Sequence, residues 1–397
     1  MEVDTLEEKF QKISVFKDES KLSVFYVPEN LPHRERELHQ LLNIFKPVID
    51  SPGAFSRIVL ITGPVGTGKT AVAKRLGALI GEAAKRGGVN LKYVHINCRR
   101  EKTNFLILLQ LARSLIPNIP NRGYSPAELL NIIVKSISEQ DVSIILVLDE
   151  IDYILNTIGE EIIYDLTRVN DEKLNFKQPL SIILISKNDN IQVMLDESVL
   201  SLIPHSIIKF QPYTALQLEH ILEERVKEAF YPSTISPGVL SLIAEIASEW
   251  GDARYALELL WRAGKYAEEE GLLKIFPEHV RKARADTCPE ISKELILNLD
   301  RNDKLILLSI SRTLIRSRVA YAPIGLIEKI YRLICEEYRE KPRSHTQIWD
   351  RVRVLSRIGL ISTRLSGKGV RGKSTIIGLA DIPAEVLEKE LIEWLKK

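Results

Sequence analysis

Cysteine is scarce in this chain of 397 residues, which contains only Cys98, Cys288 and Cys335. An odd number leaves one thiol unpaired, and none of the three has the C-x-x-C spacing of a zinc or redox site. The composition therefore argues against a disulfide framework and a zinc site. It favours a reducing compartment.

Long apolar runs are also absent. A helix that crosses a bilayer needs about 20 consecutive apolar residues, and charged or polar residues interrupt every hydrophobic stretch before that length. The first residues do not show the basic start and apolar core of a secretory signal. We therefore expect a cytoplasmic protein with no membrane partner.

The chain as a whole has no large excess of positive or negative charge, but one part of it is strongly basic. The formal net charge is +2. Residues 340–375 hold nine Lys and Arg against Glu340 and Asp350, a net of +7, which leaves about −5 for the remainder. A basic cluster near the C-terminus of a mildly acidic chain predicts a binding site for a polyanion.

One glycine-rich segment has a specific chemical meaning. A strand-like apolar run over residues 57–62 precedes it, and a helical pattern over residues 71–80 follows it, which is the context of a phosphate-binding P-loop. Glycines let backbone N–H groups face phosphate oxygens, and the helix N-terminus adds partial positive charge. The lysine is predicted to reach the β- and γ-phosphates, and the last threonine to ligate Mg²⁺. The predicted triphosphate site consists of Gly63, Pro64, Val65, Gly66, Thr67, Gly68, Lys69 and Thr70.

Further apolar runs of strand length alternate with helical patterns. They cover residues 91–97, 142–148, 180–186 and 206–210. Together with the run before the P-loop they predict a parallel α/β sheet, because β-branched runs separated by helices form such sheets. Ligands bind at the carboxyl ends of the strands in these sheets, so the P-loop should lie near the ends of the other runs.

The run over residues 142–148 leads into Asp149-Glu150, the pattern known as Walker B. Asp149 is predicted to hold Mg²⁺ through water, and Glu150 to orient or deprotonate the attacking water. Acidic residues also end strands as solvated turn formers. Downstream of a P-loop, however, the metal and catalytic roles are the stronger interpretation.

A four-residue segment, Gly251-Asp-Ala-Arg254, opens a helix within the helical stretch 214–285. With Asp252 as N-cap, Arg254 falls in the first helical turn. An arginine there can contact a γ-phosphate through its guanidinium. A surface ion pair is the alternative.

Past residue 289 the pattern changes to helices followed by a strand pair. Helical runs cover residues 303–317, 324–338 and 344–358, and strands over 360–365 and 374–379 flank a basic, glycine-rich connection. This order is typical of a winged helix, whose second helix of the turn enters the major groove while the hairpin reaches the backbone or minor groove. A winged helix that docks a protein is the alternative.

Contacts to double-stranded DNA are assigned to that helix and the hairpin. Ile348, Val352 and Leu355 fall at helical spacing and should face the core. Candidates for base edges are Thr346, Gln347 and Arg351. The other predicted DNA-binding residues of this part are Arg353, Arg364, Lys368, Arg371 and Lys373.

The motifs in this order resemble an AAA+ ATPase of the initiator and helicase-loader branch. They are the P-loop, Asp149-Glu-Ile-Asp152, the strand ending in Ser186, and Gly251-Asp-Ala-Arg254. Three further strings resemble the archaeal origin-recognition family of replication initiators, and the likeness spans essentially the whole chain. These strings are Ser14-Val-Phe-Lys-Asp18, the segment from Tyr26 to Glu35, and Tyr164-Asp-Leu-Thr-Arg168.

The resemblance implies three parts: an AAA+ nucleotide-binding domain over 1–212, a helical lid over 213–288 and a winged-helix domain over 289–397. It implies ATP or ADP with Mg²⁺ as cofactors and makes Arg254 the sensor-2 arginine of the lid. An initiator-specific insertion maps to residues 103–138, where Arg122 offers the one cation of the connecting loop toward DNA. The residues implied to wrap the adenine are Tyr26, Val27, Leu31, Pro32, His33 and Arg34.

The implied function is recognition of replication-origin DNA, with nucleoid association. The implied partners are paralogous initiators and the replicative helicase, which the protein would help to load. An ATP-dependent transcription regulator would share the P-loop and winged helix but not the Leu31–Glu35 and Gly251–Arg254 strings.

Three positions depart from the family pattern. At sensor 1, where the family carries Asn, Lys187 stands in register and Asn188 follows one residue later; Asn188 is retained as a candidate catalytic residue. In the hairpin, the family's first arginine is replaced by Val370. No arginine occurs between Arg168 and Arg225, so the family's Asp-Pro-Arg-Val arginine is missing.

An arginine finger contributes roughly 10³–10⁵ in rate, so its absence has consequences for activity. We predict slow ATP hydrolysis and no activation of a neighbour's ATPase from that surface. Two interpretations stay open: a weak Mg²⁺-dependent ATPase that loads or remodels a partner, and a nucleotide-locked origin-binding regulator with little turnover. The departures suit a divergent paralogue.

Overall fold

A computed structural model describes residues 14–170, 177–189, 191–195, 200, 207–287, 299–358, 360–365, 375–379 and 383–396. The chain forms two compact units. The first, called the sheet unit, comprises Val27–Gln217 and Trp250–Ala253. The second, called the helical unit, comprises the residues before Val27, Leu218–Glu249 and the chain from Arg254 onward.

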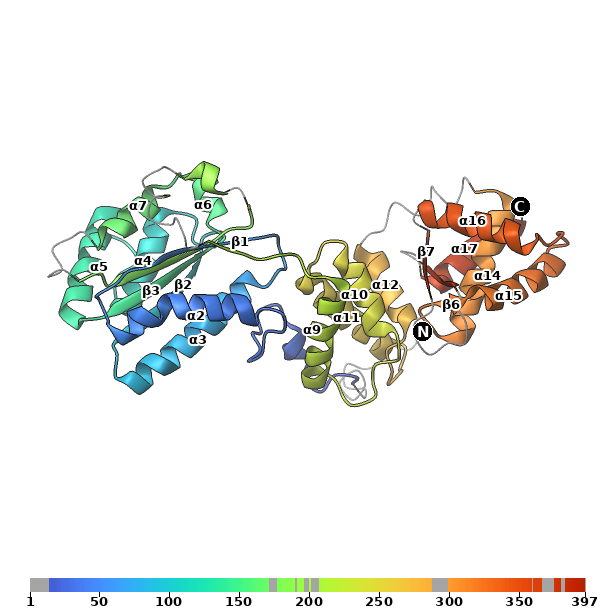
Figure 1. The fold of residues 1–397 in the computed structure, drawn as a ribbon, viewed down its shortest axis with the longest axis horizontal. Helices are drawn as coiled ribbons and strands as arrows, with labels where there is room; N and C mark the ends of the chain where they lie inside the picture. Colours follow the sequence, from blue (N-terminus) through green and yellow to red (C-terminus); the bar gives the residue numbers. More distant parts are fainter. Residues whose placement is uncertain are drawn as a thin grey trace. The chain divides into compact units, whose positions relative to one another are not determined.

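A five-stranded parallel sheet with strand order β2-β3-β4-β1-β5 organises the sheet unit (Figure 1). Strands β3 and β4 are buried along their whole length, as continuous Ile, Leu and Val runs predict for a sheet covered on both faces. The parallel α/β prediction is confirmed. The strands are β1 (Ile58–Thr62), β2 (Leu91–Asn97), β3 (Ser143–Asp149), β4 (Leu180–Ile185) and β5 (Ile207–Lys209).

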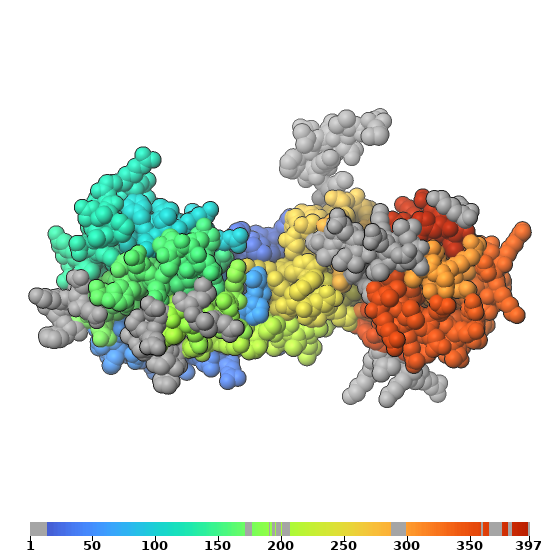
Figure 2. Space-filling model, turned by 90° about the horizontal axis from the view of Figure 1, so that it is seen from above, coloured from blue at the N-terminus to red at the C-terminus, as the bar shows by residue number. Residues whose placement is uncertain are grey.

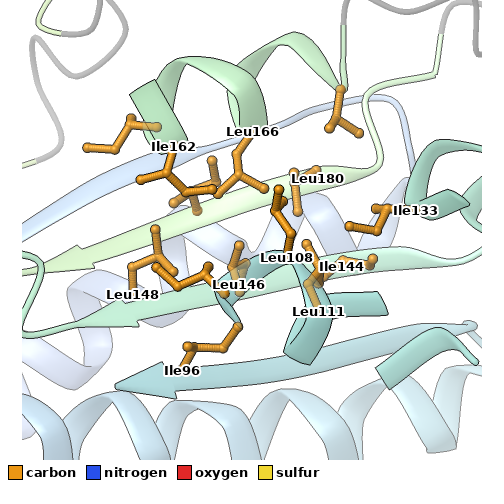
Figure 3. Packing of buried hydrophobic residues seen from close by; sticks show 14 of the residues in the cluster. Ile96, Leu108, Leu111, Ile133, Ile144, Leu146, Leu148, Ile162, Leu166 and Leu180 are labelled. Carbon is orange, nitrogen blue, oxygen red and sulfur yellow. The ribbon is translucent and has the colours of Figure 1, made fainter. Parts of the chain in front are cut away.

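Helices cover both faces of this sheet. Successive residues of β3 point to opposite faces, so alternate residues pack against the helices of one face or the other. Leu146 and Leu148 pack in one cluster with α4, α5 and α7 (Figure 3). Ile145 and Val147 pack in the other cluster with α2 and α3. The helices of this unit are α2 (Glu35–Asp50), α3 (Lys69–Gly87), α4 (Asn104–Leu115), α5 (Pro126–Gln140), α6 (Asp152–Thr157) and α7 (Glu161–Arg168).

The carboxyl ends of three strands meet at one edge of the sheet. Asn97 at the end of β2 is in register with Asp149 at the end of β3, and Asp149 is in register with Ile185 at the end of β4. Strand β1, which leads into the P-loop, pairs with β4 and β5. The register therefore brings the predicted nucleotide-site segments to one edge.

Among the described residues, the helical unit contains the lid helices and a winged helix. The lid consists of α9 (Ala215–Ala229), whose first turn belongs to the sheet unit, α10 (Val239–Ser248), α11 (Ala253–Glu269) and α12 (Pro277–Thr287). The winged helix has α14 (Arg301–Ser317), α15 (Ile324–Glu337), α16 (His345–Arg357) and an antiparallel sheet of order β6-β8-β7. Its strands are β6 (Ala322–Pro323), β7 (Ile361–Leu365) and β8 (Thr375–Leu379), followed by α17 (Ala384–Lys396).

The winged-helix prediction is confirmed, with two elements that the sequence analysis missed, the short strand β6 and helix α17. Helix α17 packs its Leu387, Leu391 and Leu395 into the same core as α14. These leucines recur every four residues, the spacing of one helical face, so the signal was present in the sequence.

Polar contacts join lid and winged helix inside the helical unit, whose yellow and orange segments lie side by side in Figure 2. Arg281 of α12 is 1% exposed and donates to the carbonyl oxygen of Ala320 over 2.8 Å. Lys282, next to it, bridges Glu270 at 2.7 Å and Glu385 of α17 at 2.8 Å. The three-domain division at residues 212 and 288 stays a prediction, since the two compact units divide the chain differently.

Candidate nucleotide site and nucleic-acid surface

The P-loop adopts the backbone conformation that its glycines allow. Gly63, Gly66 and Gly68 have φ values of 143°, 76° and 89°, in the region that favours glycine. A Cβ at Gly63 would lie 2.3 Å from the carbonyl oxygen of Phe210, and one at Gly66 would lie 1.8 Å from Oδ1 of Asp252. Glycine is required at both positions because neighbouring segments approach the loop this closely.

Lys69 begins α3 and is 8% exposed. Its Nζ donates to the carbonyl oxygens of Gly63 and Pro64, each over 2.6 Å. The ammonium group therefore lies inside the curve of the loop, at the N-terminus of a helix. This arrangement fits the phosphates of a nucleotide.

Asp149 is 3% exposed, and both of its carboxylate oxygens take part in hydrogen bonds. Oδ2 accepts the Thr70 hydroxyl at 2.8 Å and lies 3.1 Å from His95 Nε2, while Oδ1 accepts the backbone N–H of Glu150 at 3.0 Å. Burial acts to raise the pKa of Asp149, but these hydrogen bonds outweigh it and keep the pKa below its ordinary value. An anionic carboxylate beside a hydroxyl fits a hard divalent cation such as Mg²⁺.

Glu150 has a positive φ of 56°. This conformation costs a non-glycine residue about 1–3 kcal/mol and persists where the surroundings fix it, often at active sites. Its Oε1 accepts a hydrogen bond from Asn97 Nδ2 at 3.4 Å. The geometry thus gives the two acidic residues different partners on β2, His95 for Asp149 and Asn97 for Glu150.

Arg34, predicted to contact adenine, has its guanidinium engaged within the protein. It is 4% exposed, and Nε donates to the Thr67 carbonyl oxygen at 2.9 Å while Nη2 donates to that of Gln211 at 2.6 Å. The guanidinium also stacks on Tyr213, 4.0 Å from the ring centre. Arg34 therefore holds the P-loop against the segment after β5, a positioning role that the sequence reading missed.

The other predicted adenine contacts are divided between the two units. Val27, Leu31, Pro32 and His33 belong to the sheet unit, whereas Tyr26 belongs to the helical unit. Lys21 Nζ lies 4.2 Å from the centre of the Tyr26 ring, and Arg225 Cζ lies 4.8 Å from it. The adenine role of this segment stays a prediction.

The loop after β4 is organised by Asp152. Its Oδ1 accepts the Ser186 hydroxyl at 2.6 Å, and its Oδ2 accepts the Lys187 backbone N–H at 2.9 Å. Ser186 Oγ also accepts the backbone N–H of Asn188 at 2.8 Å. The catalytic role of Asn188 stays a prediction, while Asp152 gains a structural role in fixing the sensor-1 loop.

The segment before Arg254 lies against the P-loop. Within the sheet unit, the Ala253 N–H donates to the Gly66 carbonyl oxygen at 3.1 Å, and the Tyr213 N–H donates to that of Gly251 at 3.2 Å. Arg254 is the second residue of α11 and belongs to the helical unit. Its contact with a nucleotide stays a prediction.

Helix α16, the predicted recognition helix, begins with a capping box. The Ser344 side chain accepts the Gln347 N–H, and Gln347 Oε1 accepts the Ser344 N–H at 3.1 Å. The carboxamide oxygen of Gln347 is thus engaged in the cap rather than free to accept from a base. Ile348, Val352 and Leu355 are buried as predicted, and Thr346 and Arg353 are exposed.

Two of the predicted DNA-binding arginines are paired with acidic side chains of this chain. Arg351 contacts Asp300 at 3.0 Å and Asp303 at 3.2 Å. Arg364 on β7 forms an ion pair with Glu245 of the lid and lies 3.7 Å from the Tyr321 ring centre. All three carboxylates lie outside residues 340–375, so the charge count of that window overstates its free positive charge.

Of the remaining predicted DNA-binding residues, Arg353 and Arg122 lie within the described residues. Arg353 lies 5.6 Å from the Trp349 ring centre with its side chain exposed, and Arg122 is exposed before α5. Lys368, Arg371 and Lys373 of the hairpin lie outside the described residues. Their DNA contacts stay predictions.

Cys98 and Cys335 are buried free thiols, and Cys288 lies outside the described residues. Among helices of the described residues, none is long and apolar enough to cross a membrane.

The fold and the site together define an AAA+ protein with a helical lid and a winged helix. The site contributes the P-loop lysine and an aspartate that accepts a hydroxyl group at the end of a parallel strand. Family profiles agree with this class. Residues 56–195 match the AAA domain, residues 219–285 the Cdc6 AAA+ ATPase-type lid domain, and residues 294–389 the CDC6 C-terminal winged helix domain.

Comparison with known proteins narrows the class to a family. The chain is 34% identical to the ORC1-type DNA replication protein 2 of Sulfurisphaera tokodaii, covering 97% of this chain and 94% of the relative. It is 36% identical to the protein of that name from Saccharolobus solfataricus, covering 96% and 94%. The chain belongs to the ORC1/Cdc6 family of replication proteins, which confirms the resemblance.

Solved structures agree. The crystal structure of Cdc6p from Pyrobaculum aerophilum matches with a TM-score of 0.84 at 31% identity, covering 96% of this chain and 99% of that one. The Aeropyrum pernix ORC1 protein, solved in complex with DNA, matches with a TM-score of 0.63 at 31% identity, covering 95% and 97%.

Proposed function

We propose that this protein is a replication initiator that binds ATP or ADP with Mg²⁺ and recognises double-stranded DNA at an origin. The observation that carries the nucleotide part is the contact of Thr70 with Asp149 at 2.8 Å. It brings the last P-loop residue and the Walker B aspartate into one site, with Lys69 in the same loop. The DNA part is supported by the winged-helix fold and by the name of the relative solved with DNA.

The proposed division of labour follows the three family matches. Residues 1–212 would hold the nucleotide, residues 213–288 would form the lid that brings Arg254 to the γ-phosphate, and residues 289–397 would contact DNA. Exposed Thr346 and Arg353 on α16, together with Lys368, Arg371 and Lys373 of the hairpin, are the proposed contacts. Most should be to phosphates, which position the protein without reading sequence.

Hydrolysis is proposed to be slow. Mg²⁺, when bound, would supply charge stabilisation at the phosphates. Glu150 would act as the base for the attacking water, while Lys69 holds the phosphates. The chain has no arginine between Arg168 and Arg225, and Lys187 stands in register with the family's sensor-1 asparagine, with Asn188 one residue later. Both features favour low turnover.

A second candidate is therefore a nucleotide-locked regulator that marks origins, as opposed to a working loader of the replicative helicase. Single- and multiple-turnover ATP hydrolysis distinguish the two, with Glu150→Gln as the inactive control. A wild-type rate within about threefold of Glu150→Gln supports the regulator. A rate at least about 100-fold above it, the size of a general-base contribution, supports the working ATPase.

DNA recognition is tested on sheared DNA from the source genome. The purified protein captures fragments at physiological salt, and the captured DNA is sequenced. A sharp peak at a replication origin supports origin recognition. Flat coverage would contradict it and would mean that binding is to phosphates alone.

A further inference from the structure

Strand β2 presents two polar side chains to the nucleotide edge of the sheet. His95 and Asn97 are two residues apart, so they share one face of the strand. Asn97 is in register with Asp149, and Asn97 contacts Glu150 as described above. His95, a member of none of the motifs read from the sequence, has its own contact with the site.

The His95 ring is oriented toward Asp149. Nε2 lies 3.1 Å from Asp149 Oδ2, with side-chain exposures of 18% for His95 and 4% for Asp149. Nδ1 is buried and has no hydrogen-bond partner in the part of the chain that the structure describes. Because Asp149 is an anionic acceptor, Nε2 carries the hydrogen and donates. Within the described residues, Asp149 is thus the hydrogen-bond partner of the His95 ring.

Asp149 Oδ2 accepts from His95 and Thr70 together, and Oδ1 accepts from the Glu150 backbone. Besides donating to Asp149, Thr70 has a second proposed role, since its hydroxyl oxygen is the proposed ligand of the cation. The Glu150 N–H fixes only the other oxygen. His95 therefore supplies the donor that constrains Oδ2 without itself being needed as a ligand.

We propose that His95 is a positioning residue for the divalent cation: its Nε2–H group fixes the Asp149 carboxylate beside Thr70 and so raises the affinity of the site for Mg²⁺ when nucleotide is bound. This inference rests on the proposed nucleotide function. It assigns His95 no contact with the nucleotide and no part in proton transfer. Hydrogen-bond partners of metal-binding side chains typically contribute 10–100-fold to metal affinity.

The test is a Mg²⁺ titration of the full chain with a fluorescent ADP analogue, N-methylanthraniloyl-ADP. In His95→Phe, which keeps a ring but removes the donor, the Mg²⁺ concentration at half-saturation rises about tenfold or more. In His95→Gln, whose carboxamide N–H replaces the imidazole donor, it stays within about threefold of wild type, less than the charge-assisted bond is worth. Affinity for the analogue without Mg²⁺ stays within about twofold in both variants, because neither removes a phosphate contact.

Matched controls separate this inference from the function on which it rests. His39→Phe changes an exposed histidine on α2 and leaves the Mg²⁺ midpoint unchanged. Lys69→Ala weakens binding of the analogue with and without Mg²⁺. An equal Mg²⁺ midpoint for His95→Phe and wild type overturns the His95 proposal alone. Wild-type protein that binds no analogue, or binds it without regard to Mg²⁺, overturns both.

A measurement on the wild-type protein does not depend on the stability of a variant. Nitrogen NMR of ¹⁵N-histidine-labelled protein with Mg²⁺ and ADP reports which ring nitrogen of His95 carries the hydrogen. The His95 signal is assigned by its loss in His95→Gln. A hydrogen on Nε2 with bare Nδ1 is the expected result. A hydrogen on Nδ1 with bare Nε2 overturns the proposal.

Discussion

The nucleotide edge of the sheet and the winged helix arrange their charged groups differently. At the sheet edge, Lys69 donates to the backbone carbonyl oxygens of Gly63 and Pro64, and Asp149 accepts from Thr70 and lies within hydrogen-bond distance of His95. In the winged helix, Arg351 and Arg364 are held by carboxylates of the same chain. The first region places its charged groups among hydrogen-bond partners of the P-loop and β2, while the second neutralises part of its charge through ion pairs.

The difference shows that the net charge counted over a sequence window can exceed the positive charge that is available to bind a ligand. The +7 of residues 340–375 includes two arginines whose partners, among them Glu245 and Asp303, lie far outside the window. An internal ion pair must be exchanged before such an arginine can bind a phosphate. The free cations of the region are therefore fewer than the sequence suggests.

The largest expected effect is at the sheet edge. Lys69→Ala should weaken binding of N-methylanthraniloyl-ADP on the order of 100-fold, because it removes a charge-assisted contact worth about 1.5–3 kcal/mol and the ammonium that the loop surrounds. Fluorescence anisotropy measures the loss. Lys85→Ala, an exposed lysine in the last turn of the same helix, should bind as wild type does. Equal affinities of the two variants would contradict the site.

The next effect compares two arginines of α16. Arg353→Ala should lower the slope of log K against log[salt] by about 0.9, the value for one phosphate contact, because Arg353 is exposed. Arg351→Ala should change the slope by less than about 0.3, since Asp300 and Asp303 already neutralise Arg351. DNA binding at four salt concentrations measures both. A larger slope change for Arg351→Ala would reverse the comparison.

A gain of DNA binding is expected from breaking the contact between lid and winged helix. Glu245 pairs with Arg364 and accepts from Tyr321, and burial together with this hydrogen bond raises the pKa of Tyr321 to about 12. Glu245→Gln removes the negative charge and leaves Arg364 free to bind a phosphate. The salt slope should steepen by up to about 0.9.

The matched control for that gain is Glu249→Gln, which removes a carboxylate from the same stretch of the lid, where Glu249 contacts Arg284 at 3.4 Å. Neither partner belongs to the basic cluster, so the slope should not change. An unchanged slope in Glu245→Gln as well would show that Arg364 does not reach DNA.

The smallest expected effect is on the pH dependence of stability, through His279 of the lid. Burial lowers the pKa of His279, and Lys282 acts in the same direction while Glu270 and Glu278 oppose it. The unfolded chain therefore takes up a proton near the ordinary value of 6.5, and the folded chain resists it. Stability is full above pH 6.5 and falls as the pH drops through the lowered folded pKa, by at most about 1.4 kcal/mol per pH unit. Urea unfolding of wild type and His279→Gln between pH 7.5 and 5.5 measures this, and equal slopes would contradict it.

Much of the fold could be read from the sequence because its signals are local. The P-loop residues, the Asp149-Glu150 pair and the strand runs are short strings whose spacing has one structural meaning. The winged helix could likewise be predicted from the order of its helices and strands. Helix α17 carried the same kind of signal in its spaced leucines.

The individual contacts of the site could not be predicted in this way. Arg34 carries the signature of a nucleotide-binding segment, yet its guanidinium holds Thr67 and Gln211. Gln347 is placed on a helix face suited to base contacts, yet its oxygen completes a helix cap. In each case a competing partner inside the protein decides the role of the side chain.

The sequence by itself determined the parallel sheet, the P-loop and acidic pair, and the winged helix, since each depends on residues close together in the chain. Only the tertiary structure decided which distant side chains serve them. His95 meets Asp149 across 54 positions, Arg34 meets Gln211 across 177, and Arg364 meets Glu245 across 119. No local period links such pairs, because strand register and helix packing bring them together only when the chain folds.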